Sequence, residues 1–165
     1  TIVSYHRRKA APAWLLARAD ELEATATGYS GQSRTRLLHN ARAVRDYERN
    51  FGAKAYDILN VPVMDLQYDD VIVSVMPDLH VREKGVEKIV KLEFTKDAPE
   101  KGLVKIVTQA MFEAVRNEGL TIATKNVLYV DVARGKIHKG ATMRSRMAKN
   151  IEAACKNISD IWDKI

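Results

Sequence analysis

The chain has 165 residues, a length typical of one domain over residues 1–165, and its 46% hydrophobic residues exclude an intrinsically disordered chain. The net charge of +6 at pH 7 favours an anionic partner only weakly, because a charge of this size informs about association and not about fold. A single cysteine, Cys155, excludes an internal disulfide, and no apolar run approaches the ~18–20 residues of a membrane span, so we predict a cytoplasmic protein that does not enter a membrane.

Two amphipathic helices are predicted at the N-terminal end, in a helical part that covers residues 12–52. The first runs from Pro12 to Thr27 and ends before Gly28; its apolar residues recur at helical spacing (Leu15, Ala19, Leu22 and Ala26). The second runs from about Ser33 to Phe51, and its apolar stripe consists of Leu37, Ala41, Val44 and Phe51.

Glu48 interrupts the apolar stripe of the second helix. A carboxylate in such a stripe has to be paired, bound to a metal ion or placed at the exposed edge, because burying an unpaired charge is costly. A salt bridge to Arg45 or Arg49 is the simpler interpretation. The alternative is that Glu48 is a metal ligand.

Strands are predicted from Ala55 onward, in a sheet core that covers residues 55–138. The stretch around Pro62 is expected to be an edge strand or an irregular one. Val71–Lys96 is predicted to be a hairpin of two strands that turn near "REKG". Side chains alternate across a strand, so one face of this hairpin is apolar and the other carries polar residues, namely Asp78, His80, Lys91, Glu93 and Thr95. In an antiparallel pair, Asp78 then approaches Glu93.

The C-terminal half adds two helices and a strand. A helix is predicted from Glu100 to Asn117, then a strand within "NVLYVDV", and a last helix over residues 141–165. The apolar stripe of the last helix is either core or a seam for a homo-oligomer (Met143, Met147, Ile151, Ala154, Ile158 and Ile165). Taken together, the elements predict an α/β fold with a central mixed sheet flanked by helices.

The polar face of the hairpin is the candidate site. Two carboxylates, Asp78 and Glu93, are hard oxygen ligands of the kind that bind Mg²⁺ or Mn²⁺, and such an ion keeps waters and meets a phosphate. A nearby ammonium group such as Lys91 can orient a water or neutralise charge. The alternative is an ordinary solvated strand face with paired charges. His80 is a secondary candidate or a partly exposed strand residue, and Asp131 is expected to be a solvated strand residue.

Pro77-Asp78, followed by an apolar strand that ends at Glu93 and by a helix containing "TQAMFEA", resembles the PD-(D/E)XK nuclease superfamily over roughly Leu37–Val132. The resemblance implies a restriction-endonuclease-like fold and Mg-dependent hydrolysis of nucleic acid, most readily DNA. It also implies Asp78 and Glu93 as metal ligands, with Glu48 matching the acid of the preceding helix. Gln109 is the nearest match to the glutamine of the RecB-type exonuclease branch, although Glu113 stands where that branch has a tyrosine.

The sequence departs from this superfamily at its lysine, because Thr95 stands two residues after Glu93. Lys91 lies two residues before Glu93 on the same face, so either Lys91 supplies the ammonium group or the protein keeps the fold without cleavage. The latter would be a DNA-binding or assembly protein. Basic residues on three segments either contact phosphates or form solvated helix faces (Arg7, Arg8 and Lys9; Arg34, Arg36, Arg42, Arg45 and Arg49; Arg144, Arg146 and Lys149).

Overall fold

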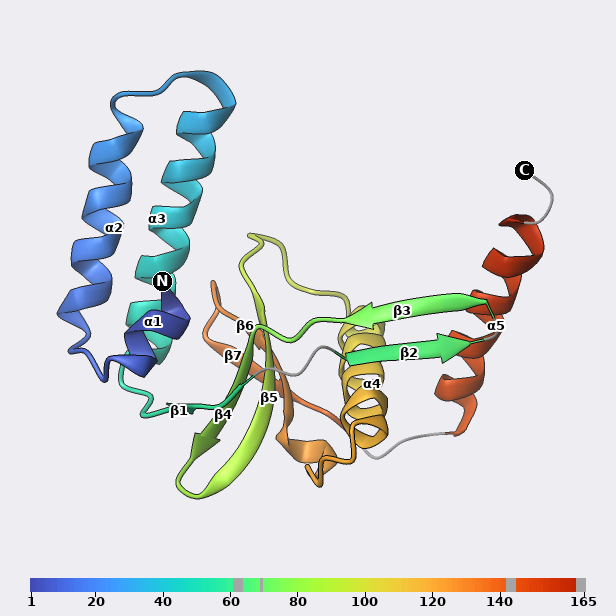
Figure 1. Cartoon of the computed structure of the whole chain (residues 1–165). Coiled ribbons are helices and arrows are strands. Elements are labelled where there is room, and N and C mark those ends of the chain that lie inside the picture. Colours follow the sequence, from blue (N-terminus) through green and yellow to red (C-terminus); the bar gives the residue numbers. More distant parts are fainter. Residues whose placement is uncertain (61–63, 69, 142–144, 163–165) are drawn as a thin grey trace.

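The computed structural model describes residues 1–60, 64–68, 70–141 and 145–162, with the backbone alone at 145–148, 150 and 162. The chain begins with three helices, α1 (Ile2–Arg7), α2 (Ala13–Ala26) and α3 (Gly31–Phe51). The last two form a long antiparallel hairpin that stands beside the sheet (Figure 1). Their contact is apolar and lies where the sequence predicts it, on Leu15, Ala19, Ala41 and Val44. Both predicted N-terminal helices are therefore confirmed within one or two residues.

The helix α1 was not predicted, because six residues are too few for a helical period to show. Tertiary contacts hold it in place. The Tyr5 hydroxyl donates to the carbonyl of Gly52 over 2.5 Å, and His6 Nε2 lies 2.8 Å from the Tyr47 hydroxyl. Both Tyr5 and His6 are buried. The start of the chain is thus fastened to the C-terminal half of α3.

The main sheet has five strands in the order β1 (Asp57–Ile58), β4 (Leu79–Glu83), β5 (Val86–Glu93), β6 (Val127–Asp131) and β7 (Lys136–Lys139). The strands β5 and β6 are parallel and are connected through α4 (Lys101–Asn117), whereas the other pairs are antiparallel. The chain is therefore an α/β protein with a central mixed sheet, as the sequence predicts.

A second, two-stranded sheet consists of β2 (Met64–Tyr68) and β3 (Val71–Val75). The prediction of one strand from Val71 to Arg82 is therefore wrong. Pro77 lies between β3 and β4, and proline has no N–H to donate to a ladder, so the chain leaves one sheet here and enters the other. The irregular stretch expected around Pro62 falls on residues 61–63, outside the described residues.

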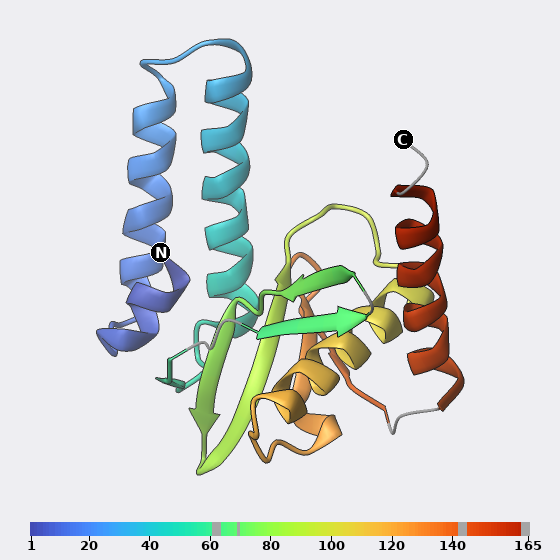
Figure 2. The same ribbon diagram turned by 45° about the vertical axis from the view of Figure 1, so that its right-hand side comes forward.

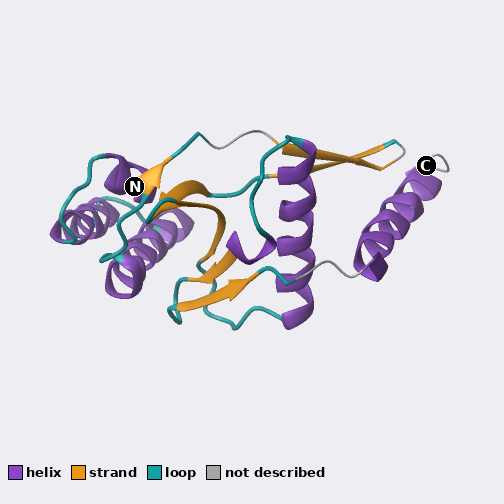
Figure 3. Ribbon diagram, turned by 90° about the horizontal axis from the view of Figure 1, so that it is seen from below, coloured by secondary structure: helices purple, strands orange, loops and turns teal. Residues whose placement is uncertain are grey.

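Helices cover both faces of the main sheet (Figures 2 and 3). On one face, α1–α3 pack on alternate residues of the strands, which include Leu79, Val81, Val90 and Leu92. On the other face, α4 packs through Met111 and Ala114 on Ile89 and Val127. α4 covers the middle of the face that carries the candidate polar residues, so this face is solvated toward the two ends of β5.

The last helix, α5 (Ser145–Trp162), lies against α4 and the β2–β3 sheet. Cys155 is buried, while Ile158 and Ile161 are exposed. The prediction that the apolar stripe of this helix forms a homo-oligomer interface stays a prediction. Several side chains of that stripe lie outside those that the structure describes (Met143, Met147 and Ile165). Within the described residues, no helix has the length and apolarity needed to cross a membrane.

Candidate metal and phosphate site

Asp78 lies directly before β4, where it is fixed to β5 through both its backbone and its side chain. Its N–H donates to the carbonyl of Val90 over 2.9 Å, and its Oδ2 accepts the N–H of Leu92 over 2.7 Å. A carboxylate that accepts a backbone N–H continues the ladder beyond the end of the regular strand. Asp78 is therefore held at one defined point on β5, although it lies outside the strand in which the sequence predicts it.

Lys91 reaches the same carboxylate. Its Nζ lies 3.1 Å from Asp78 Oδ2 and 3.5 Å from the carbonyl oxygen of Met76. Both side chains of the Asp78–Lys91 pair remain 37% exposed, so water screens the attraction and the pair contributes little to stability. The pair is thus accessible and can open for a ligand at small cost.

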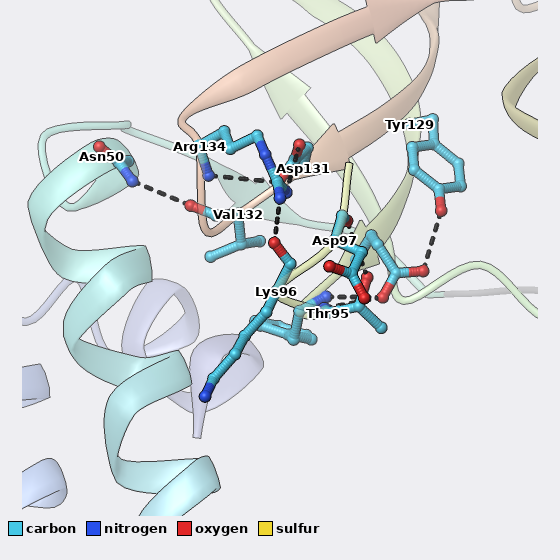
Figure 4. Close-up of polar contacts among 10 residues, drawn as sticks. Asn50, Thr95, Lys96, Asp97, Tyr129, Asp131, Val132 and Arg134 are labelled. Carbon is cyan, nitrogen blue, oxygen red and sulfur yellow. Dashed lines mark hydrogen bonds and ion pairs between the residues drawn. The ribbon is translucent and has the colours of Figure 1, made fainter. Parts of the chain in front are cut away.

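Glu93 ends β5 on the face that carries Lys91, and its carboxylate accepts three hydrogen bonds. Its Oε1 accepts the N–H groups of Phe94 and Thr95 over 2.9 and 3.0 Å, and its Oε2 accepts the hydroxyl of Tyr129 over 2.9 Å (Figure 4). Burial alone would raise the pKa of Glu93, but the hydrogen bonds from Thr95 and Tyr129 outweigh it and hold this pKa below its ordinary value. Glu93 is therefore an ionised, oriented carboxylate.

Replacing Tyr129 by Phe is expected to raise the pKa of Glu93, because the ionised carboxylate loses a hydrogen-bond donor. The loss of this bond should also lower the free energy of unfolding by about 1 kcal/mol. A pH titration of the glutamate carboxyl resonances by NMR measures the first effect and urea unfolding the second. Tyr68→Phe removes a hydroxyl that binds Glu113 instead and serves as the matched control. An unchanged Glu93 pKa in Tyr129→Phe contradicts the expectation.

Glu48 is not brought to this cluster. It lies on α3 toward Tyr5, whose pKa is raised by burial and, to a smaller extent, by the Glu48 charge. The simpler interpretation from the sequence, a salt bridge to Arg45 or Arg49, is also wrong within the described residues. Arg45 pairs with two acids of α2 (Asp20 and Glu23), and Arg49 pairs with Asp46.

Asp46 is the acid of α3 that comes near the end of β5. It is 8% exposed and lies between Arg42 and Arg49, at 3.6 and 2.6 Å. It lines a cleft of about 790 Å³ between α3 and the segment after β5, and Glu93 lines the same cleft. Sequence reasoning missed Asp46 because it lies outside the apolar stripe, where an acid is usually solvated.

Asp131 and Arg134 connect the segment after β5, which contains Lys96, to the turn between β6 and β7. Asp131 is 1% exposed, so the prediction of a solvated strand residue is wrong. Its carboxylate accepts Arg134 Nη1 at 3.1–3.2 Å, and Arg134 Nη2 donates to the carbonyl of Lys96 (Figure 4). Asn50 of α3 donates to the carbonyl of Val132 over 2.9 Å.

His80 is buried at 6% exposure, so the expected partly exposed strand position is wrong. Its Nδ1 lies 2.9 Å from the carbonyl oxygen of Asn60 and its Nε2 lies 3.4 Å from Glu87. Asn60 follows β1 and Glu87 lies near the start of β5, at the opposite end of this strand from Glu93. His80 therefore fastens the sheet edge.

Gln109 also lies elsewhere, on the buried side of α4. Its Nε2 donates to Glu113 over 3.0 Å, and the hydroxyl of Tyr68 donates to the other oxygen of Glu113 over 2.7 Å. The structure thus places a tyrosine from β2 beside Glu113. A small cavity of about 360 Å³ borders this group.

The donor set of the site fits a hard divalent cation. Asp78 and Glu93 supply carboxylate oxygens on one face, and Mg²⁺ commonly binds through one or two carboxylates while phosphate and water complete its shell. In the described part of the chain, no three His, Cys, Asp or Glu side chains are grouped to hold a metal ion by themselves. A substrate phosphate would therefore have to supply part of the coordination.

No family model, curated protein or solved structure matches this chain.

Proposed function

We propose that this chain is a metal-dependent nuclease that hydrolyses phosphodiester bonds in nucleic acid, with DNA as the expected substrate, on a restriction-endonuclease-like PD-(D/E)XK fold. The observation that carries the proposal is the side-chain attachment of Asp78 to β5 next to Lys91 and one residue before Glu93. Element order supports it as well, because a helix leads into a mixed sheet and α4 and β6 follow the motif strand.

In this proposal, Asp78 and Glu93 hold Mg²⁺ or Mn²⁺. The bound ion supplies an activated water and stabilises negative charge on the phosphate. Asp78 is kept in place by the Leu92 amide, and Glu93 by Tyr129 and the following amides, so both carboxylates are oriented before substrate arrives. Lys91 takes the role of the missing superfamily lysine and places its ammonium group beside Asp78, where it faces the scissile phosphate.

A second candidate, a nuclease-fold protein that binds DNA or joins an assembly without cleaving, is favoured by one specific observation. Thr95, at the position of the superfamily lysine, carries a hydroxyl in place of an ammonium group and donates its backbone N–H to Glu93. Lys91 is meanwhile engaged with Asp78, where its positive charge competes with a metal ion. This candidate predicts salt-dependent DNA affinity with no turnover under any metal.

The decisive experiment is cleavage of plasmid and single-stranded DNA with Mg²⁺, Mn²⁺ or EDTA. We expect metal-dependent products, and a loss of about 100-fold or more in rate for Asp78→Ala and for Glu93→Gln, because each removes an oriented ligand. Asp65→Ala, an exposed acid of β2, is the matched control and should cleave like the wild type. Circular dichroism confirms that the variants fold.

Lys91→Met tests the role of Lys91 in a protein that cleaves. A large rate loss with unchanged DNA affinity supports the role of the ammonium group in catalysis. Equal cleavage by the wild type and Asp78→Ala would falsify the assignment of the site. Binding without cleavage under both metals would leave the second candidate.

A further inference from the structure

The cleft between α3 and the segment after β5 has features that the proposed metal site does not use. One wall is α3, with His39 and Arg42, and the opposite wall is formed by Phe94, Thr95 and Lys96. Glu93 is among the residues that line it, so the cleft reaches the end of β5. Its volume of about 790 Å³ lies in the range of sites that enclose small ligands, and it is far too small for a DNA duplex.

Positive charge lies on both walls. Lys96 is exposed, and its side chain extends toward α3 (Figure 4). Its carbonyl is held by Arg134, so the base of this side chain is fixed. Arg42 is 57% exposed and lines the cleft from α3. A phosphate chain in the cleft would thus meet Arg42 on one side and Lys96 on the other.

An exposed aromatic ring lines the same cleft. Phe94 is 40% exposed although it directly follows the sheet core at Leu92 and Glu93. Burying such a ring against the surrounding chain is favourable, so its exposure at a cleft wall leaves a flat apolar surface for a ligand. An aromatic ring beside lysine and arginine is the combination that binds unpaired bases and their backbone together.

Acids line the cleft as well. Asp46 is paired with Arg42 and Arg49, and Glu93 accepts hydrogen bonds from Tyr129 and two amides. Asp97 directly follows Lys96 and is exposed. These acids weaken the attraction of Arg42 and Lys96 for phosphate, and a bound cation would offset part of their charge.

We propose that this cleft binds a single-stranded segment of nucleic acid, with one base stacked on Phe94 and adjacent phosphates contacting Lys96 and Arg42. Binding of the strand stands by itself, whereas its delivery to Glu93 and Asp78 for cleavage rests on the proposed function. The inference names the substrate class as unpaired strands or duplex ends with an unpaired overhang. Under this inference the single-stranded DNA of the cleavage assay is cleaved and the closed plasmid is not, because duplex DNA without free ends does not fit the cleft.

Fluorescence anisotropy with a labelled 12-nucleotide oligo(dT) and a labelled 12-base-pair duplex tests the proposal, in EDTA so that no cleavage occurs. We expect tighter binding of the single strand. Phe94→Ala should weaken it by about 5- to 150-fold, while Phe94→Tyr retains it. Lys96→Met should lower the slope of log affinity against log salt by about 0.7. The matched controls are Tyr29→Ala, an exposed aromatic residue beyond the end of α2, and Lys125→Met; both should bind like the wild type.

Equal affinity of Phe94→Ala and the wild type, or tighter binding of the duplex, overturns the proposal. Because the measurement is made without metal, its outcome is separate from that of the cleavage assay. Strand binding that depends on Phe94 in a protein that never cleaves contradicts only the proposed nuclease activity. Metal-dependent cleavage with unchanged activity in Phe94→Ala contradicts only the role of the cleft.

Discussion

Arg134→Met is expected to lower the free energy of unfolding by about 3–5 kcal/mol, because it leaves the carboxylate of Asp131 buried without its cation. Asp131 is 1% exposed, and Arg134 Nη1 contacts both of its oxygens at 3.1–3.2 Å. The Arg134 side chain is 27% exposed, so the guanidinium is partly hydrated whereas the carboxylate is not. Urea unfolding at pH 7 measures the effect.

Two further variants identify the cause of this loss. The double variant Asp131→Asn/Arg134→Met removes both charges and should recover part of the stability, since no ion is then left in the interior. Arg82→Met breaks a pair with Glu87 in which both side chains are over a third exposed, and it should cost less than about 1 kcal/mol. Equal losses in Arg134→Met and Arg82→Met would contradict the role of burial.

The same substitution tests how the cleft wall is positioned. Arg134 Nη2 holds the carbonyl of Lys96, so Arg134→Met should loosen the segment from Phe94 to Asp97. Faster hydrogen exchange at these amides, with unchanged exchange in α2, would show that the effect is local. Stability and the candidate site are thus coupled through one buried ion pair.

Periodicity predicted the elements that pack through a simple stripe. The α2–α3 hairpin and α4 were placed within about two residues, since their apolar residues follow the helical repeat. The break at Pro77 was missed because the residues on both sides alternate like one strand, and alternation cannot show which partner each half pairs with. Pro77 marks the point of the break, and the tertiary pairing shows that β3 and β4 belong to different sheets.

Alternation was also enough to bring Asp78, Lys91 and Glu93 to one face, but it did not find what surrounds them. The hydroxyl that donates to Glu93 belongs to Tyr129 on the parallel strand β6. The acid of α3 that lines a cleft together with Glu93 is Asp46, whereas the sequence suggested Glu48. The positions of Tyr129 and Asp46 depend on how α4 and α3 pack on the sheet. The periodicity of strands and helices in the sequence does not predict this packing. The burial of Asp131 has the same origin, because its partner lies in the following turn.

Lowering the pH from 7 to 5 is expected to destabilise the protein through His6. Burial lowers the pKa of His6 from 6.5 to about 4. As the pH falls below 6.5, the unfolded chain binds a proton that the folded chain does not, so stability is full above about pH 6.5 and declines until the folded group titrates near pH 4. The total loss is about 3 kcal/mol, of which about 2 kcal/mol falls between pH 7 and 5.

The contacts of His6 explain why it stays neutral in the folded state. Its ring lies among those of Tyr5, Tyr47 and Tyr56, with centroids 4.7, 5.9 and 5.0 Å away. Its Nε2 lies 2.8 Å from the Tyr47 hydroxyl, which can donate to a neutral ring or accept from a ring N–H. Protonation is therefore opposed by the burial of the positive charge among apolar rings.

His6→Gln isolates this contribution, since glutamine can accept from Tyr47 but does not titrate. The variant should be less stable at pH 7, because it loses ring contacts, but its free energy of unfolding should change far less between pH 7 and 5. His39→Gln, an exposed histidine of α3, should keep the wild-type slope. Several carboxylates with lowered pKa values titrate below about pH 4.5 and do not enter this window (Glu83, Glu87 and Glu93). If the free energy of unfolding of His6→Gln falls between pH 7 and 5 as much as that of the wild type, groups other than His6 cause the acid sensitivity.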